Sequence, residues 1–294
     1  MKNFYLICMS FICLNTNAVN IAITFDDFPM PNGALFTVKE RAQKYVDAFT
    51  QHNAKAAFFC VGQHCKNRKD DSLVKLLLTN GQFVGNHSMS HPRLSASTLA
   101  DFEKEIISNE ELLSTFGKVQ KWFLYPYLDY GDNAEIGGSQ EKLMGALDVL
   151  TKLGYKEAYS TIKNFDWQIN KRMQEALKKQ KNVDFDKLKK LYLDFLKGWI
   201  QHYIDLYKTV TNKEIVHTIN FQDNDLNAFC MADILEMVKQ AGWNIVSPEI
   251  AFSDLSWRLE VQNNSELLAN KCDSLNCDYI DKELFDFNRS IFLD

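Results

Sequence analysis

Short apolar runs of strand length alternate with longer segments of helical periodicity along most of this chain, and this alternation limits the possible folds more than any other feature. Strands are expected at residues 19–25, 56–61, 82–85, 119–124, 158–162, 215–221 and 243–246. Helices are expected at residues 39–50, 72–80, 98–114, 140–153 and 228–241. Alternating elements of this kind favour parallel strands covered by helices. The sequence predicts an α/β fold of about seven parallel strands, and 294 residues is an ordinary length for a TIM-like barrel.

The expected barrel occupies residues 19–252 and contains one unusual region. Residues 170–210 are mostly helical in pattern, with a break near Asn182 and Val183, and we interpret them as a helical insertion. Residues 253–294 lack the alternation of strands and helices, so we expect a C-terminal extension packed on the barrel.

Residues 1–18 have the pattern of a signal peptide. Lys2 supplies the positive start, residues 4–14 a short apolar segment, and residues 16–18 a small-residue exit. The apolar segment is too short to span a bilayer, and no other segment is long and apolar enough to do so. We therefore expect export, with a secreted or periplasmic location.

The remaining composition excludes one class of partner. The net charge is −5 and the pI about 5.7, so no basic face suggests a nucleic acid. Lysines gather only at residues 171–190, where acidic and apolar residues interleave as on a solvated helix face.

Five cysteines follow the predicted signal peptide. In an oxidising compartment Cys60 with Cys65, and Cys272 with Cys277, could each close a small loop, which leaves Cys230 free.

Polar clusters follow the ends of the expected strands. The clusters are Asp26-Asp27, His87/His91, Tyr125–Tyr127, Asp166-Trp167 and Gln222–Asp225. In a parallel barrel the carboxyl ends of the strands share one mouth, where active sites assemble. The clusters are therefore expected to meet.

His87 and His91 are candidates for metal ligands. Four residues apart, they would point to the same side if they lay on a helical turn. Two imidazoles are too few for a stable site, so we expect a carboxylate from Asp26 or Asp27 as the third ligand. Taken alone, the two histidines and the aspartate pair have simpler explanations as turn or helix-cap residues.

The order of these clusters resembles the polysaccharide deacetylases, the chitooligosaccharide-deacetylase-like carbohydrate esterases. The resemblance rests on Thr24-Phe-Asp-Asp27, His87-Ser-Met-Ser-His91, Tyr125-Pro-Tyr127 and Asp166-Trp167, in this order. It implies a distorted (β/α) barrel that removes N- or O-acetyl groups from chitin, peptidoglycan or a related acetylated glycan with a divalent metal.

The resemblance also assigns roles residue by residue. It places the metal on Asp27, His87 and His91, a set that suits Zn²⁺, with Co²⁺ or Ni²⁺ as alternatives. It makes Asp26 the general base and counts Asp166 with the catalytic residues. The backbone N–H of Tyr127 would hold the oxyanion of the tetrahedral intermediate. The side chains expected to line the sugar groove are Tyr125, Pro126, Tyr127 and Trp167. Without the family pattern, Tyr-Pro-Tyr would indicate a rigid turn and Trp167 a core residue.

Two positions depart from the family pattern. Leu124 stands where an arginine usually braces the base, and Gln222 where a histidine usually acts as the acid. An amide cannot donate a proton as an acid, although it can hydrogen-bond a leaving group. Asp223 or Asp225 could replace the acid if burial raised their pKa.

Two hypotheses of different class follow. One is a secreted metal-dependent deacetylase with an altered acid, and the other is a catalytically impaired family member that binds an acetylated glycan. A phosphoesterase is disfavoured because the pattern suggests no cluster of Lys or Arg at the mouth. His217 is expected to be a core residue, and His52, His64 and His202 surface or helix-face residues.

Overall fold

The computed structural model describes residues 18–66 and 72–253. The predicted signal peptide, the pair Cys272 and Cys277, and all but the first residue of the predicted C-terminal extension lie outside these ranges. Within them, no helix is both long and apolar enough to cross a membrane.

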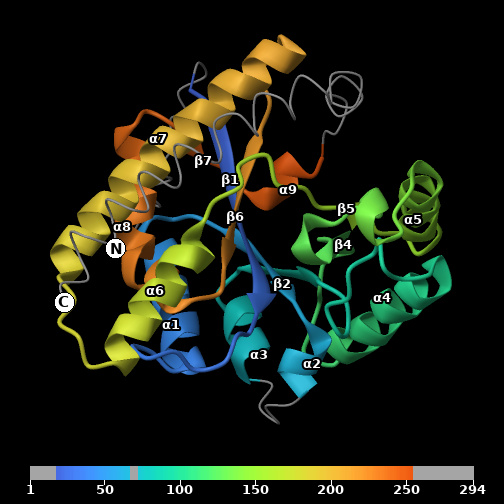
Figure 1. The fold of residues 1–294 in the computed structure, drawn as a ribbon, viewed down its shortest axis with the longest axis horizontal. Coiled ribbons are helices and arrows are strands. Elements are labelled where there is room, and N and C mark those ends of the chain that lie inside the picture. The colour runs from blue at the N-terminus through green and yellow to red at the C-terminus, as the bar shows by residue number, and fades with distance from the viewer. Residues whose placement is uncertain (1–17, 67–71, 254–294) are drawn as a thin grey trace, which may run out of the picture.

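The described strands form a single parallel sheet that curls into an incomplete barrel (Figure 1). The strands are β1 (Asn20–Phe28), β2 (Ala56–Cys60), β3 (Phe83–Asn86), β4 (Trp122–Phe123), β5 (Lys156–Glu157), β6 (His217–Gln222) and β7 (Asn244–Ile245). Their order is β5-β4-β3-β2-β1-β6, and β7 pairs with the start of β1. The predicted α/β class and the distorted barrel are confirmed.

The helices lie outside the sheet. They are α1 (Val38–Gln51), α2 (Gly62–Lys66), α3 (Ser72–Thr79), α4 (Leu99–Ser114), α5 (Gln140–Lys152), α6 (Asp166–Lys178), α7 (Phe185–Thr211), α8 (Asp225–Gln240) and α9 (Pro248–Ala251), with short 3₁₀ turns η1 (Pro126–Leu128) and η2 (Ala134–Ile136). The chain breaks between α6 and α7, close to the predicted break. Gly154 and Gly242, with φ of +72° and +81°, follow α5 and α8 closely, where a left-handed residue ends a helix without strain.

One predicted strand mostly does not form, and its residues are joined to β6 by other hydrogen bonds. Residues 158–162 were expected to form a strand, but only Lys156–Glu157 pairs with β4, and Ile162 forms an isolated parallel bridge to Ile219. The hydroxyl groups of Thr161 and Thr218 cross this gap, because each donates to or accepts from the other segment's backbone. The segment thus joins β6 loosely, and the barrel stays distorted.

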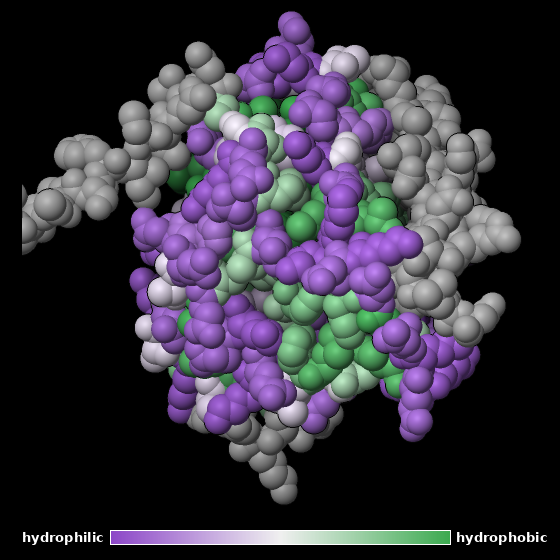
Figure 2. All heavy atoms as spheres, turned by 90° about the vertical axis from the view of Figure 1, so that its left-hand side faces the viewer, coloured by the Kyte–Doolittle hydropathy of each residue, from purple (hydrophilic) through white to green (hydrophobic). Residues whose placement is uncertain are grey.

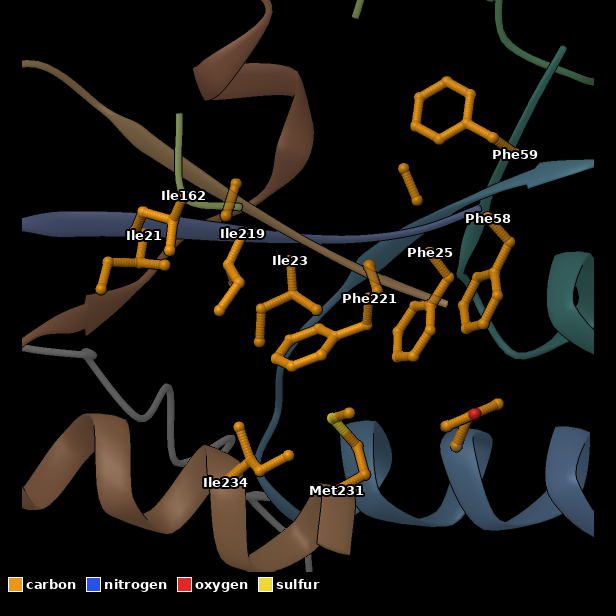
Figure 3. Packing of buried hydrophobic residues seen from close by; sticks show 14 of the residues in the cluster. Ile21, Ile23, Phe25, Phe58, Phe59, Ile162, Ile219, Phe221, Met231 and Ile234 are labelled. Atoms are coloured by element: carbon orange, nitrogen blue, oxygen red, sulfur yellow. The ribbon is translucent and has the colours of Figure 1, made fainter. Parts of the chain in front are cut away.

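The core lies between the sheet and the helices α1 and α8. Strand β1 is buried on both faces, as its almost continuous apolar run requires. Phe25 stacks on Phe58 with ring centroids 4.6 Å apart, and Tyr45 of α1 lies 4.5 Å from Phe25. Figure 3 shows Phe25, Phe58 and Phe221 directed toward these helices, while Phe59 points to the other side of the sheet. This packing fixes the ends of β1 and β6, where the site lies.

The outer helices present a polar surface. Figure 2 looks onto the side of the molecule where α7 lies and shows hydrophilic side chains over most of that face. Helix α7 buries one stripe that includes Leu188, Tyr192 and Leu196, and its lysines lie outside that stripe. This agrees with the solvated helix face predicted from the interleaved lysines.

Candidate metal centre and active site

A bulge at the end of β1 brings two adjacent carboxylates to one place. Side chains of successive strand residues normally point to opposite faces. The pairing of β1 with β2 shifts register between Phe25 and Phe28, and Asp27 has a left-handed φ of 57°. Asp26 and Asp27 can therefore both reach the cavity at this end of the sheet.

The two histidines meet Asp27, although not through a helical turn as predicted. His87 follows β3 directly and His91 lies in a loop, where Ser88 and His91 have left-handed φ of 65° and 63°. Ser88 Oγ accepts a hydrogen bond from the His91 backbone N–H at 2.9 Å, which holds this loop. The spacing argument was wrong, because a tight loop and not a helix brings the rings together.

The ligand atoms of Asp27, His87 and His91 lie within 4.8 Å of one another. The two Nε2 atoms are 3.2 Å apart, and Asp27 Oδ1 lies 2.9 Å from His91 Nε2 and 3.7 Å from His87 Nε2. Two ligands at about 2.1 Å from one ion, in tetrahedral arrangement, are about 3.4 Å apart. The donor set and its spacing therefore fit a small divalent cation such as Zn²⁺.

The surroundings keep the ligands in the protonation states that a metal needs. Burial lowers the pKa of His87 to about 4, so its imidazole is neutral, and its Nδ1 lies 2.7 Å from the Leu124 carbonyl oxygen, which directs Nε2 toward the site. Burial alone would raise the pKa of Asp27, but its interactions with His91 and His87, led by the hydrogen bond from His91, outweigh burial and leave that pKa well below its usual value.

Two amides of β6 hold the two carboxylates. Asn220 Nδ2 donates to Asp26 Oδ2 at 2.6 Å, and Gln222 Nε2 donates to Asp27 Oδ2 at 2.8 Å. Both residues lie on the same side of β6, two positions apart, and Gln222 is in register with Asp26. Gln222, predicted at the position of the acid, is thus bonded to a metal ligand. Asn220 was missed, although polar residues two apart at a strand end were a usable signal.

Asp26 is recessed next to other acids. Burial, followed by the charges of Asp27 and Asp166, raises its pKa well above the usual value in the metal-free protein. The amide of Asn220 opposes this rise. A raised pKa is the direction of shift that a general base requires.

Asp166 begins α6 and connects the end of β6 to α8. Its Oδ2 accepts hydrogen bonds from the Gln222 backbone N–H and from the side chains of Asn224 and Asn227. Burial raises its pKa to about 6 against these hydrogen bonds. Its carboxylate is 2 % exposed, so the structure gives it the contacts of a positioning residue at the cavity wall.

Asp223 and Asp225 do not serve as replacement acids. Arg41 Nε lies 2.9 Å from Asp223 Oδ1, and Arg41 Nη1 lies 3.3 Å from Asp225 Oδ1, with all three side chains buried. Both carboxylates also accept backbone N–H groups of the β1–α1 loop. Paired in this way, they hold that loop and lie outside the cavity lining.

The predicted sugar groove is a cavity of about 550 Å³ beside the ligands. Trp167 and Tyr127 line it, with exposed fractions of 48 % and 54 %, and the Tyr127 ring lies 4.4 Å from that of His91. Tyr127 is the second residue of η1, so its N–H has no partner within that turn.

Three further predictions about this region need correction. Tyr125 is 1 % exposed and packs against Phe102 and Tyr130, so its ring belongs to the core, and Pro126 beside it is also buried. Two cations, Arg93 and Lys163, line the cavity, where no cluster of Lys or Arg was expected.

Other predicted residues are placed as follows. Leu124 is fully buried in the main core, and His217 is a core residue, as predicted. His64, expected at the surface or on a helix face, lies half-buried on α2, and its Nδ1 lies 3.3 Å from the Asp27 carbonyl oxygen. Cys60 and Cys65 are both buried and not joined, so the predicted loop closure between them is absent here.

Comparison with known proteins places a family model on the first half of the chain. The polysaccharide deacetylase model matches residues 14–158, a segment that contains Asp26, Asp27, His87, His91 and Tyr127. It ends before Asp166 and Gln222.

Curated relatives match over part of their length. A peptidoglycan-N-acetylglucosamine deacetylase of Bacillus cereus is 31 % identical over 129 residues, 44 % of this chain and 43 % of that protein. A chitooligosaccharide deacetylase of Sinorhizobium fredii is 34 % identical over 31 % of this chain and 38 % of its own. A peptidoglycan-N-acetylmuramic acid deacetylase of Bacillus subtilis is 29 % identical over 53 % and 52 %. The chain thus spans about half the length of these relatives or less.

Solved structures share the fold at low identity. A chitin deacetylase from Colletotrichum lindemuthianum superposes with a TM-score of 0.55 at 18 % identity, over 82 % of this chain and 90 % of that one. A CE4 family pseudoenzyme from Bacillus anthracis superposes with a TM-score of 0.54 at 15 % identity, over 78 % and 63 %. These similarities support the fold.

Proposed function

Because the polysaccharide deacetylase model matches residues 14–158, we propose that the chain is a metal-dependent hydrolase that removes acetyl groups from an acetylated glycan such as peptidoglycan or a chitin oligosaccharide. The observation that carries the proposal is the meeting of Asp27, His87 and His91 within 4.8 Å, with Asp26 beside them in one cavity. The names of the curated relatives support the choice of substrate class.

The roles of the side chains follow from this geometry. Asp27, His87 and His91 would hold the divalent cation, which when bound supplies Lewis-acid chemistry by polarising a carbonyl and acidifying water. Asp26, oriented by Asn220, would accept the proton of the attacking water.

The remaining groups bind and orient the glycan. The exposed faces of Tyr127 and Trp167 suit a pyranose ring, and the Tyr127 N–H would donate to the developing oxyanion.

The leaving group sets the limit of this activity. Within the described residues, the position of the usual acid holds Gln222, which has no proton to donate as an acid and already donates to Asp27. Loss of a positioned acid typically costs a factor of about 10² to 10⁴. An amine must be protonated as it leaves, whereas an O-acetyl ester releases an alcohol more readily, so ester hydrolysis would suffer less.

A second candidate function is the binding of an acetylated glycan without turnover. The Gln222 contact favours it, and so does the buried Leu124 at the position of the usual arginine. A protein of similar fold from Bacillus anthracis is described as a CE4 family pseudoenzyme, and a mutant of it has restored enzymatic activity.

Acetate release from matched N-acetylated and O-acetylated glycans, with and without chelator, tests the proposal. Release that the chelator abolishes and Zn²⁺ restores would support the hydrolase. Glycan binding by metal-loaded protein with no acetate released from either substrate would favour the second function.

We also propose that the protein is exported. The support is the pattern of Lys2 and the apolar residues 4–14. Fractionation of cells with N-terminal sequencing tests this, and an uncleaved protein confined to the cytoplasm would oppose it.

A further inference from the structure

Two cations line the cavity without an acidic partner. Arg93 and Lys163 both contribute to its wall, and no carboxylate of the described residues lies within ion-pair distance of either side chain. Their charges are therefore available to a ligand.

Arg93 is also oriented toward the site. Its guanidinium lies 3.9 Å from the centre of the Tyr127 ring, and that ring lies 4.4 Å from the ring of His91. A stacked guanidinium keeps its hydrogen-bond donors in a fixed plane, which suits a carboxylate. The stack places the guanidinium donors of Arg93 on the Tyr127 ring, which also lies against the candidate metal ligand His91.

The backbone of Lys163 is fixed by a separate contact. The indole N–H of Trp199 donates to the Lys163 carbonyl oxygen, and the side chain of Lys163 is exposed at the cavity. An ammonium in this position adds a second positive charge to the cavity lining.

The acids of the cavity are all engaged by other groups. Asp27 faces His91, Asp26 accepts from Asn220, and Asp166 accepts from Gln222 and its neighbours. The cavity lining carries three carboxylates, Asp26, Asp27 and Asp166, against the two cations Arg93 and Lys163. A divalent cation held by Asp27 and the histidines would make the formal charge of the lining positive, so an anionic ligand is favoured in the metal-loaded protein.

From these contacts we propose that the cavity selects acetylated glycans in which a sugar unit carries a carboxylate close to the acetyl group that is removed. Arg93 and Lys163 bind that carboxylate. This inference rests on the proposed function, because it concerns the same cavity. It narrows the substrate from any acetylated glycan to an acidic one.

The test compares three ligands of equal length on zinc-loaded protein. They are a neutral N-acetylglucosamine oligomer, an oligomer that contains N-acetylmuramic acid, and the methyl ester of that second oligomer. Calorimetry gives Kd, or KM is used where acetate is released. We expect about tenfold tighter binding of the carboxylate form than of its methyl ester, with the difference shrinking as salt is raised.

The variants Arg93→Gln and Lys163→Gln should each remove several-fold of that preference, measured as the ratio of the Kd of the methyl ester to the Kd of the carboxylate form. Lys104→Gln, at an exposed position on α4 outside the cavity lining, changes the net charge equally and should leave the preference intact.

The outcomes separate the two proposals. Equal binding of all three ligands would overturn the inference and leave the proposed function standing. A preference that persists in the Arg93→Gln, Lys163→Gln double variant would also overturn it. Binding of none of them by protein that holds its metal would overturn both.

Discussion

The side-chain amide of Asn220 donates to the carboxylate of Asp26, with 2.6 Å between Nδ2 and Oδ2. The other end of this amide is also fixed, because Thr24 Oγ1 donates to Asn220 Oδ1 at 2.9 Å. A hydroxyl proton on the oxygen end leaves the NH₂ end to face Asp26. In the family that the sequence resembles, an arginine usually braces the general base, and this chain has Leu124 at that position. Here an amide from β6 makes the contact to the base.

Replacing Asn220 by leucine should therefore reduce turnover without loss of the metal. A hydrogen bond to a charged group is worth about 1.5–3 kcal/mol, so kcat is expected to fall by about 10- to 100-fold. Metal content should stay unchanged, since Asp27, His87 and His91 are not altered. Acetate release and metal analysis on the same preparation measure both quantities.

A milder variant provides the control for that prediction. Thr24→Val removes only the hydroxyl that orients the amide and should lower kcat by less than Asn220→Leu does. An Asn220→Leu protein with full turnover, or one that has lost its metal, would contradict the assigned role.

The two adjacent aspartates should differ in their effect on metal binding. Asp27→Ala removes one of three ligands and is expected to weaken Zn²⁺ binding by at least about 100-fold. Asp26→Ala should hold one equivalent of Zn²⁺ and release no acetate. Metal analysis after dialysis measures this, and stoichiometric Zn²⁺ in Asp27→Ala would refute the ligand assignment.

The general plan of the fold was visible in the sequence, because it follows from local patterns. Apolar runs bounded by turn residues predict strands, and glycine after a periodic segment predicts a helix end. The polar cluster after each strand then had to fall at one end of a parallel sheet. The pair Asp26-Asp27 could be grouped with His87 and His91 on this basis, whereas the choice of Asp27 as the ligand came from the family resemblance.

What could not be predicted depends on backbone shape or on distant contacts. Nothing in the sequence shows that Ser88 and His91, which are not glycines, adopt left-handed φ, so the histidine loop was taken for a helical turn. The resemblance assigned Tyr125 to the groove, but the direction of its side chain is set by packing against Phe102, which the sequence does not show. The ion pair between Arg41 and Asp223 joins residues 182 positions apart.

Restoring histidine at position 222 should increase amide hydrolysis selectively. Gln222 lines the cavity, so an imidazole there would reach the leaving group and could donate a proton. We expect acetate release from an N-acetylated glycan to rise by about 10²-fold, with a smaller gain on the matched O-acetylated glycan.

The control for that variant is Gln222→Asn, which keeps an amide and should show no gain. If Gln222→His also gains nothing on either substrate while retaining its metal, the acid must come from another residue or from the solvent.

The buried ion pairs of Arg41 make it important for stability. Arg41→Met leaves Asp223 and Asp225 buried without a cation, and breaking a buried pair on one side typically costs about 3–5 kcal/mol. Urea unfolding should show a loss of this size in the free energy of unfolding. Lys104→Met, at an exposed position on α4, should change it by less than about 0.5 kcal/mol. A loss of similar size in both variants would argue against a special role of the Arg41 network.

His217 should make the metal-free protein sensitive to mild acid. Burial lowers its pKa from the usual 6.5 to about 4. Below pH 6.5 the unfolded chain binds a proton at His217, whereas the folded chain does so only near pH 4, so stability falls as the pH falls through this window. Between pH 7.5 and pH 5 this amounts to about 2 kcal/mol.

His217→Phe keeps an aromatic ring beside Tyr207 and should lose about 2 kcal/mol less than the native protein over the same interval. Because His87 and Asp166 titrate alike in both proteins, the difference between their urea unfolding curves isolates His217, and equal losses would rule out its contribution.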